Sequence, residues 1–460
     1  MKGINELKEV YFLGIGGIGM SAIARYFHTL GIKVSGYDKT PTTLTDALQL
    51  EGIPVVFEDD ISKMPATPDW VVYTPAIPQN HSGFLNYKKN GIPVLKRSEV
   101  LGEITKGEFT IAVAGSHGKT TVSSMIAHIL THAGKPVTAF LGGICNNYNS
   151  NYWSQVLDGA DSAKEIVVVE ADEFDRSFHR LSPDMAVITA VDTDHLDIYG
   201  SKQAIDEAFV EFTNKITEEG VLVIKASQSI EKSLPFIDKV FYGLHDTDAD
   251  VYCDKYWVVD GGYLFQLNYF GQLVKGIRLN IGGFHNIENA IAAYCIVREL
   301  GIADAVIKEA LASFKGIRRR FEKVVDNGTT VFIDDYAHHP EEIRVFIESV
   351  RELYPKQKIT AIFQPHLFSR TRDLAAEFAV QLSKADEVIL LDIYPARELP
   401  MEGVTSQLIL EHLTCSSKKI LSRDELLAHL SGCSKNHVVL TIGAGDIDKL
   451  VQPIATLLQS

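Results

Sequence analysis

Long apolar stretches, paired cysteines and excess positive charge are all missing from this sequence. No run of 18 or more apolar residues occurs, so the sequence predicts no membrane-spanning helix. The five cysteines lie far apart without a C-x-x-C pair, which is typical of free thiols in a reducing compartment. A formal net charge of −15 leaves no broad cationic surface for nucleic acid or anionic membranes. We therefore expect a cytoplasmic protein with no nucleic-acid partner and no membrane insertion.

The remaining composition is that of a globular protein with more than one core. At 460 residues, with 46% hydrophobic and 22% charged side chains, the chain exceeds the size of one ordinary domain. Apolar runs bounded by glycine or proline alternate with helical stretches, which favours an α/β fold of parallel sheets covered by helices. We predict three domains, a Rossmann-like domain over 1–106, a P-loop ATPase-type domain over 107–317 and a Rossmann-like domain over 318–460.

Individual elements follow from the same alternation. An antiparallel hairpin is predicted around Gly261-Gly262, where aromatic residues alternate, and a helix over about 286–300. The predicted strands are VYFLGI, KVSGYD, PVVF, DWVVYTPA, IPVL, FTIAVA, EIVVVE, MAVITAVD, TTVFIDDYA, ITAIFQPH, DEVILLDIYPA and HVVLTIGAGD.

The first glycine-rich loop predicts a diphosphate ligand. In YFLGIGGIGM, an apolar run meets Gly14, Gly16 and Gly19 in G-x-G-x-x-G spacing, and a second strand ends at Asp38. This spacing gives a tight turn and close approach of the backbone to a diphosphate at a helix N-terminus. A nicotinamide or flavin dinucleotide, another nucleotide and a purely structural turn all remain open on this motif alone.

A second loop, AGSHGKTT at 114–121, predicts nucleoside triphosphate binding. Backbone N–H groups there would cradle phosphates, Lys119 would reach the β- and γ-phosphates, and Thr120 would ligate Mg²⁺. The full P-loop pattern wants a glycine where Val113 stands. The strand-loop-helix context nevertheless favours a triphosphate over a structural turn.

Carboxylates follow two further strands, where ligands of open α/β sheets bind. One strand ends at Glu170 and precedes Asp172, Glu173 and Asp175, and another precedes Asp192, Asp194 and His195. One such carboxylate would suffice for an ATP-bound Mg²⁺, and a histidine would complete the shell of a second metal. The alternative is a set of acidic loop residues that simply face solvent.

The motifs together resemble the Mur ligases of peptidoglycan precursor synthesis. Each is weak alone, but they follow one another in family order along nearly the whole chain. They are GIGGIGMSAIA, AGSHGKTT, EADEFDRSF, DHLDIYG, GGFHNIENAIAA, GIRRRFE, DDYAHHPEEI, FQPHLFSRTRD and GAGDI.

The resemblance implies an ATP-dependent ligase that joins L-alanine to the lactyl carboxylate of UDP-N-acetylmuramate through an acyl phosphate, in a monomer or weak homo-oligomer. It implies ATP and Mg²⁺, with catalytic roles for Lys119, His195, Arg319 or Arg320, and His338, and metal ligation by Thr120, Glu170 and His195. The ATP-binding residues implied are Gly115, Ser116, His117, Gly118, Lys119, Thr120, Thr121, His285, Asn286 and Asn289. The first loop would hold the UDP substrate through Gly14, Gly16, Gly17, Ile18, Gly19, Asp38 and Thr74, and the amino acid would meet Asp335, Tyr336, His338, His366 and Arg370.

Two positions depart from the family pattern. Leu367 stands after His366, where this type of ligase often carries arginine. Sister ligases carry a carbamylated lysine about 15 residues beyond the metal histidine, within a helical stretch, whereas this chain reads DEAFVEF at 206–212. We therefore expect the second metal to be held without a modified lysine.

Three other functions remain as alternatives. A ligase acting on murein peptides or folate would share the central loop. A nicotinamide-dependent dehydrogenase would use the first loop and Asp38, and a nucleotide switch the second loop alone. For the Arg318-Arg319-Arg320 cluster, the alternative to phosphate contact is a solvated helix end.

Overall fold

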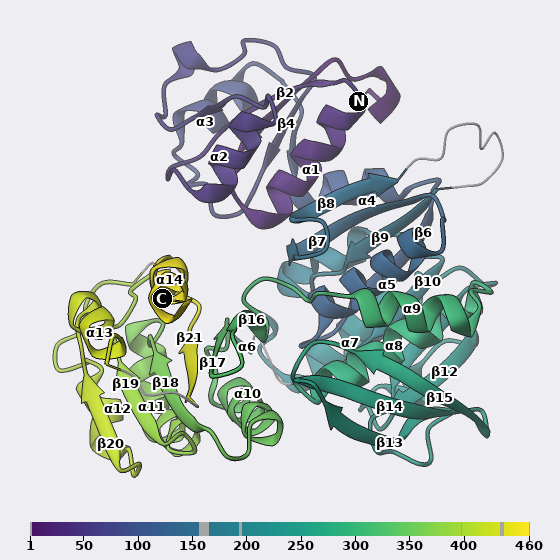
Figure 1. The fold of residues 1–460 in the computed structure, drawn as a ribbon. Coiled ribbons are helices and arrows are strands. Elements are labelled where there is room, and N and C mark those ends of the chain that lie inside the picture. The colour runs from purple at the N-terminus through teal and green to yellow at the C-terminus, as the bar shows by residue number, and fades with distance from the viewer. Residues whose placement is uncertain (1, 156–164, 193–195, 397, 433–436, 460) are drawn as a thin grey trace. The chain divides into compact units, whose positions relative to one another are not determined.

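The computed structural model describes residues 2–155, 165–192, 196–396, 398–432 and 437–459. Its strands form three helix-covered sheets, which confirms the predicted α/β class (Figure 1). The chain divides into two compact units. Unit 1 is Met1–Cys253, Leu267–Val274 and Asn289–Leu311, and unit 2 is Asp254–Gln266, Lys275–Glu288 and Ala312–Ser460. The domain limits at 106/107 and 317/318 stay predictions.

The first sheet is parallel throughout, in the order β3-β2-β1-β4-β5. It places the carboxyl end of β1 at the centre of the sheet, which is where the first glycine loop begins. Its strands are β1 Glu9–Leu13, β2 Lys33–Tyr37, β3 Val55–Val56, β4 Trp70–Tyr73 and β5 Val94–Lys96, and its helices are α1 Ile18–Thr29, α2 Thr43–Leu50, α3 Ser82–Lys89 and α4 Arg97–Thr105.

The second sheet has the order β15-β14-β13-β12-β11-β10-β6-β9-β7-β8. Strand β6 lies between β10 and β9 and parallel to both, so the loops after these three strands meet at one edge. The strands are β6 Phe109–Ala114, β7 Val137–Cys145, β8 Ser150–Gln155, β9 Ile166–Glu170, β10 Met185–Ile188, β11 Val221–Lys225, β12 Asp238–Gly243, β13 Val251–Val259, β14 Gly262–Tyr269 and β15 Gln272–Leu279. The associated helices are α5 Lys119–His132, α6 Leu196–Tyr199, α7 Lys202–Thr213, α8 His285–Glu299 and α9 Asp304–Ser313.

The predicted hairpin and the helix at 286–300 are confirmed as β13–β14 and α8. The hairpin turns at Asp260 and Gly261, whose φ angles of 49° and 69° are both positive, as a tight two-residue turn requires. The sequence prediction missed β7, β8, β11, β12, β15, β16 and β20, and it extended the strand at 185 to Asp192, although β10 ends at Ile188.

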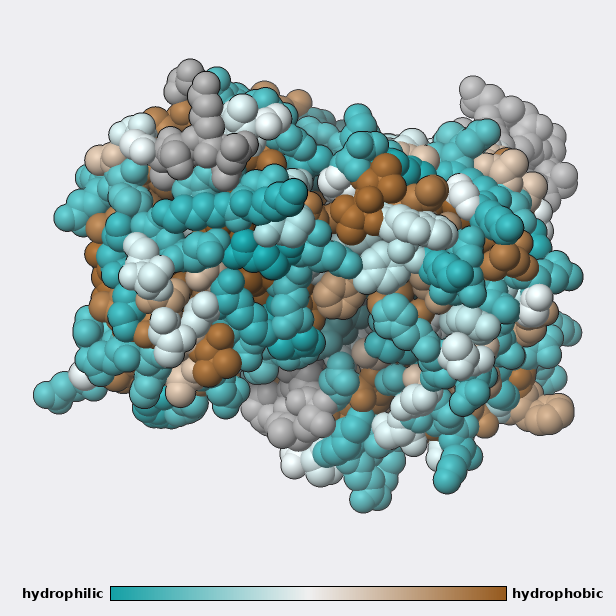
Figure 2. All heavy atoms as spheres, turned by 60° about the horizontal axis from the view of Figure 1, so that its bottom comes forward, coloured by the Kyte–Doolittle hydropathy of each residue, from teal (hydrophilic) through white to brown (hydrophobic). Residues whose placement is uncertain are grey.

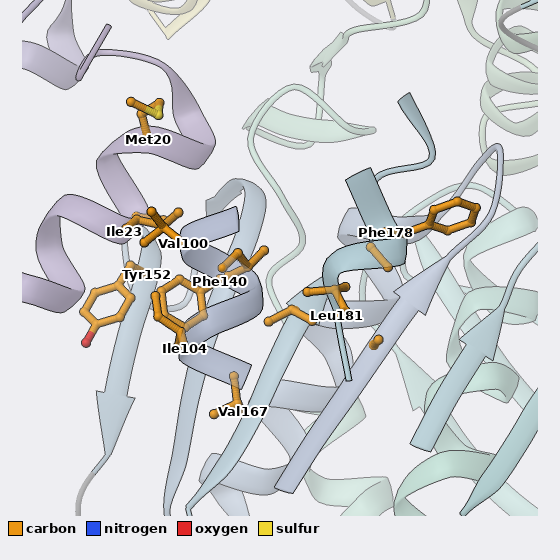
Figure 3. Close-up of a cluster of buried hydrophobic side chains, with 14 of the residues drawn as sticks. Met20, Ile23, Val100, Ile104, Phe140, Tyr152, Val167, Phe178 and Leu181 are labelled. Carbon is orange, nitrogen blue, oxygen red and sulfur yellow. The ribbon is translucent and has the colours of Figure 1, made fainter. Parts of the chain in front are cut away.

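The first two sheets share one hydrophobic core within unit 1. Figure 3 shows side chains of α1 and α4 facing side chains of β7, β8 and β9 and of the 3-10 helix η3 (Phe174–Arg180). Tyr26 of α1 meets Phe140 of β7 edge-on, with ring centroids 5.4 Å apart. Dispersion across this contact therefore fixes the first glycine loop relative to the second sheet.

The third sheet has the order β16-β17-β21-β18-β19-β20, parallel apart from the antiparallel pair β16–β17. Because β21 lies between β17 and β18, three loops meet at the carboxyl edge where the strand order reverses. The strands are β16 Glu322–Asp326, β17 Thr330–Asp335, β18 Lys358–Phe363, β19 Glu387–Leu390, β20 Ser417–Ile420 and β21 His437–Ile442, and the helices are α10 Pro340–Leu353, α11 Phe368–Leu382, α12 Gln407–His412, α13 Arg423–Leu430 and α14 Val451–Gln459.

On the face shown in Figure 2, hydrophilic side chains predominate and the apolar areas are small and separate. No helix in the described part of the chain is long and apolar enough to cross a membrane.

Candidate active site

The second glycine loop has the predicted strand-loop-helix geometry, between β6 and α5. Gly115 and Gly118 have φ angles of 131° and 80°, which only glycine adopts readily. A Cβ at Gly115 would lie 2.2 Å from Thr189 Oγ1, and one at Gly118 would lie 2.5 Å from Asn289 Oδ1. The residue after β10 and the α8 asparagine therefore press on the loop, and no side chain fits at either position.

The middle of this loop is tied to the end of β10. Ser116 N donates to the Ala190 carbonyl at 2.9 Å, and Ser116 Oγ accepts from Asp192 N at 2.9 Å. His117 Nε2 lies 3.7 Å from an Asp192 carboxylate oxygen, with both side chains more than half exposed. Thr121 is buried in the first turn of α5. These bonds fix the backbone conformation of the loop, and backbone N–H groups are what such a loop uses to bind phosphate.

Lys119 forms an ion pair inside the loop. Its Nζ donates to the Gly115 carbonyl at 2.6 Å and lies 2.8 Å from the Glu173 carboxylate. The Glu173 side chain is only 5% exposed. Burial raises the pKa of Glu173, and the Lys119 charge opposes that shift. Sequence reasoning named Glu173 only as one of several loop acids, because spacing does not tell which acid turns inward.

Thr120 and Glu170 lie together as predicted for metal ligands. Thr120 Oγ1 donates to Glu170 Oε2 at 2.9 Å, and Gly142 N donates to the same oxygen at 2.8 Å. A Cβ on Gly142 would come 2.2 Å from that oxygen. A hydroxyl beside a carboxylate fits Mg²⁺, which keeps several waters and needs few protein ligands. Gly142 was missed by sequence reasoning, since it lies in the unpredicted strand β7.

His195, predicted as a catalytic residue and metal ligand, lies outside the described residues. No group of three or more His, Cys, Asp or Glu side chains within the described ranges is arranged to hold a metal ion. Residues 206–212 lie in α7, and Lys202 at its start pairs with Asp206 at 2.8 Å.

The first glycine loop follows β1 and opens α1, as predicted. Gly14 has a φ of 87°, its N–H donates to the Tyr37 carbonyl at 2.7 Å, and a Cβ there would lie 2.6 Å from Thr74 Cγ2. Asp38 accepts from Gly16 N at 2.8 Å. Asp38 and Thr74, which follow β2 and β4, therefore lie against the turn between β1 and α1.

Arg97 of α4, which the sequence analysis did not name, places a cation beside the start of α1. Gly17 is the N-cap and Ile18 the first helical residue. A Cβ at Gly19 would lie 2.6 Å from Arg97 Nη1, and Arg97 Nη2 donates to Asp172 at 3.1 Å. Arg97 thus joins the first loop to the acidic segment after β9.

His285 and Asn286 open α8 behind a glycine pair, as predicted. Asn286 Nδ2 donates to the Gly282 carbonyl at 2.6 Å. Gly283 has a φ of 88°, and a Cβ there would come 2.5 Å from His285 Cε1. The tight Gly282-Gly283 turn is what lets both side chains stand at the helix start.

The arginine cluster is not the helix end that the alternative interpretation assumed. Residues 317–320 form a turn closed by an Ile317–Arg320 bridge, because Arg319 takes a left-handed φ of 60°. Arg319 Nε lies 3.3 Å from Asp334 and its guanidinium stands 5.1 Å from the Tyr336 ring centroid. Arg320 is exposed, and no hydrogen bond or ion pair to another described residue engages its guanidinium. Contacts among the described residues therefore hold the Arg319 guanidinium but not that of Arg320.

The predicted amino-acid residues gather at the carboxyl edge of the third sheet. The His338 ring centroid lies 5.3 Å from that of Tyr336 and 6.1 Å from that of His366. Burial lowers the pKa of His338, and it lowers that of His366 to about 4, so both rings are neutral near pH 7. His366 Nδ1 and Arg370 Nη1 are buried without a hydrogen-bond partner among the described residues.

Leu367 holds an unusual backbone conformation beside these groups. It is the N-cap of α11 with φ 70° and ψ 137°, a region that costs free energy for a residue with a Cβ. Its N–H donates to the Tyr394 carbonyl at 3.0 Å. Tyr394 in turn stacks on His366, with ring centroids 5.8 Å apart.

Adjoining stretches of the chain match family models for all three parts of one enzyme family. Residues 9–109 match the Mur ligase family catalytic domain, 113–297 the Mur ligase middle domain, and 319–445 the glutamate ligase domain of Mur ligases. The chain belongs to the Mur ligase family.

Relatives of this Mur ligase match it along its whole length. A UDP-N-acetylmuramate–L-alanine ligase of Porphyromonas gingivalis W83 is 48% identical over 99% of this chain and 100% of its own. One of Flavobacterium johnsoniae is 47% identical over 99% of each chain. The crystal structure of UDP-N-acetylmuramate-alanine ligase from Thermotoga maritima superposes with a TM-score of 0.84 at 30% identity, over 99% of each chain.

Proposed function

We propose that this Mur ligase joins L-alanine to the lactyl carboxylate of UDP-N-acetylmuramate, with conversion of ATP to ADP and phosphate. The observation that carries the proposal is identity of 43–48% over nearly the full length to relatives that all bear this activity in their names. A cytoplasmic location and a monomeric or weakly homo-oligomeric state belong to the same proposal.

The first step transfers the γ-phosphoryl group of ATP to the lactyl carboxylate, and its barrier is the approach of two anions. In the loop of Gly115, Ser116, His117 and Gly118, the Ser116 N–H is bonded to Ala190, and the other three residues would offer their backbone N–H groups to the phosphates. Lys119, whose Nζ lies 2.8 Å from the Glu173 carboxylate, would supply the positive charge. Mg²⁺, held by Thr120 and Glu170 with His195 as the predicted ligand of a second ion, would neutralise developing phosphate charge.

The loop of the first sheet fits the UDP diphosphate. Gly14 and Gly16 shape the turn through bonds to Tyr37 and Asp38. The exposed Gly17 is the N-cap of α1, at a helix N-terminus where phosphate charge is favoured. Arg97 supplies a cation beside Gly19. The Asp38 carboxylate is negative and cannot attract a diphosphate in this way. The loop therefore fits the diphosphate of a UDP sugar, and its glycine motif no longer favours a nicotinamide-dependent dehydrogenase.

Arg320 is our choice for the arginine that meets the phosphates, because its guanidinium is exposed and makes no hydrogen bond or ion pair with another described residue. Arg319 is held by Asp334 and the Tyr336 ring. Hence Arg319 serves to fix the turn and Arg320 to neutralise charge in the phosphoryl transfer.

The second step is attack of the alanine amine on the acyl phosphate, which releases phosphate and one proton from nitrogen. His338 is neutral near pH 7 and so accepts that proton. Arg370 Nη1, which has no hydrogen-bond partner among the described residues, fits the alanine carboxylate. Arg370 would thus take the place of the arginine that other ligases of this type often carry at the position of Leu367. His285, Asn286 and Asn289 remain assigned to adenine and ribose.

ADP release tests the proposal when each substrate is omitted in turn. ADP should appear only when ATP, UDP-N-acetylmuramate and L-alanine are all present. Replacement of L-alanine by a murein tripeptide with retained turnover would indicate a murein peptide ligase instead. ATP turnover by the protein alone would indicate a nucleotide switch, and stoichiometric NADH binding would restore the dehydrogenase.

A further inference from the structure

The loop of residues 443–446, which follows β21, holds the Arg319 side chain. Arg319 Nη2 donates to the Gly443 carbonyl, and Nη1 lies 3.5 Å from the Gly445 carbonyl. Gly443 N donates to the Asp335 carbonyl at 3.1 Å, so the start of the loop is hydrogen-bonded to β17, the strand that carries Asp334. Two backbone carbonyls and one buried carboxylate thus surround the guanidinium.

A second set of side chains holds the loop itself. Gln364, which follows β18 and is 4% exposed, donates from Nε2 to Asp446 at 3.0 Å and accepts at Oε1 from Ile447 N at 2.9 Å. Arg423, the first residue of α13, donates to the same Asp446 oxygen. The carboxylate of Asp446 therefore ties the loop to two neighbouring elements through charged or amide hydrogen bonds, which are stronger than neutral ones.

The loop packs so closely on Gln364 that two of its positions accept only glycine. A Cβ at Gly443 would lie 2.7 Å from the Gln364 carbonyl oxygen, and one at Gly445 would lie 2.4 Å from Gln364 Oε1. Gly443 has a φ of 146°. The carbonyls that Arg319 uses thus depend on where Gln364 and Asp446 place the loop.

We propose that Asp446 is a positioning residue for the ligase reaction, which acts through the loop carbonyls on Arg319 and so on the adjacent Arg320. The proposal rests on the proposed function, since it assigns Arg320 to the phosphates. Neither Asp446 nor Gln364 touches a substrate in this scheme. Displacement of a catalytic group by about 1 Å costs up to about 10²-fold in rate, so a loosened loop lowers turnover without altering the residues that bind UDP-N-acetylmuramate.

Asp446 can be altered without opening the core. A cavity of about 290 Å³ adjoins it, lined in part by Gln364, Tyr394, Arg423 and Asp446. Asp446→Asn keeps the size and the bond from Gln364 but removes the charge that faces Arg423. Asp448→Asn is the matched control, because Asp448 lies two residues on and is exposed.

The decisive measurement is a double-mutant cycle in the full-length ligase. We expect Asp446→Asn to lower kcat by about 10-fold, with KM for UDP-N-acetylmuramate and the melting temperature nearly unchanged, and Asp448→Asn to have no effect. In an Arg319→Ala background, Asp446→Asn should cause no further fall, because its effect passes through Arg319.

Equal falls in both backgrounds, or no fall in either, would overturn the proposal. Arg423→Ala, which alters a partly exposed side chain, is the second variant and should reproduce the fall of Asp446→Asn if the latter folds poorly. Absence of ligase turnover in the unmodified chain would instead be a failure of the proposed function. In that case the same cycle, read as the dissociation constant of ATP by calorimetry, still tests whether Asp446 acts through Arg319.

Discussion

Lys119→Met separates the catalytic role of the loop lysine from its role as a partner of Glu173. The substitution removes the cation 2.8 Å from a carboxylate whose side chain is 5% exposed. We expect turnover to fall by about 10²-fold or more, because a charge that stabilises the transferring phosphoryl group is lost. We also expect the protein to become less stable, since Glu173 is left buried without its counter-ion.

The size of the stability loss follows from that burial. An uncompensated buried charge costs about 3–5 kcal/mol, which corresponds to a fall in melting temperature of roughly 6–20 °C for a domain of about 200 residues. Protonation of Glu173 limits the loss. Burial already raises the pKa of Glu173, and removal of Lys119 raises it further. The carboxyl is therefore neutral in the variant at low pH, and the loss shrinks as the pH falls.

Calorimetry of four proteins measures this directly at pH 8 and pH 6, namely the unmodified chain, both single variants and Lys119→Met/Glu173→Gln. The double variant should regain most of the stability and none of the turnover. Lys135→Met, which removes an exposed lysine just beyond α5, is the control for loss of one positive charge. The reasoning is refuted if Lys119→Met is as stable as the double variant at pH 8, or if the stability loss grows on acidification.

Three further outcomes are expected. Gly142→Ala should raise the Mg²⁺ concentration for half-maximal rate by about 10-fold, because the new Cβ would lie 2.2 Å from Glu170 Oε2 and displace it. The control variant Gly432→Ala should leave that concentration unchanged. An unchanged Mg²⁺ titration of Gly142→Ala would show that Glu170 is not a ligand. Burial raises the pKa of Asp335 to about 7, so the native state loses stability as the pH rises from about 4 to 7. The free energy of unfolding of Asp335→Asn should therefore rise relative to that of the unmodified chain over that range, by at most about 4 kcal/mol; a difference that does not change with pH contradicts this. Removal of CO₂ at saturating Mg²⁺ should leave turnover unchanged, since residues 206–212 carry no lysine to carbamylate; a rate restored by bicarbonate would refute the expectation.

Both phosphate-type loops could be predicted because their geometry is local. A strand, a glycine turn and a helix start are adjacent in sequence, and Gly14 and Gly118 have the positive φ angles that let the chain turn there. Val113 in place of a glycine does not disrupt the strand-loop-helix geometry, because Val113 lies within β6, which continues to Ala114. The strands β7 and β8 were missed, since Gly142 interrupts the apolar pattern of one and polar residues dominate the other.

What could not be predicted comes from tertiary contacts. Spacing named Arg319 and Arg320 equally, and only the fold shows that Asp334 engages the first. Likewise Arg97 stands far in sequence from both Gly19 and Asp172, and only the packing of α1 and α4 brings it to them.

The central position of β21 in the third sheet delays completion of that sheet during synthesis of the chain. The ribosome makes β17, which ends at Asp335, and β18, which ends at Phe363, well before β21 begins at His437. Both earlier strands hydrogen-bond to β21 and not to each other. The nascent chain must therefore hold two strands without their shared partner until the final one emerges. Since the same strand leads into the loop that holds Arg319, a chain released early by the ribosome lacks both the completed sheet and the arginine's support.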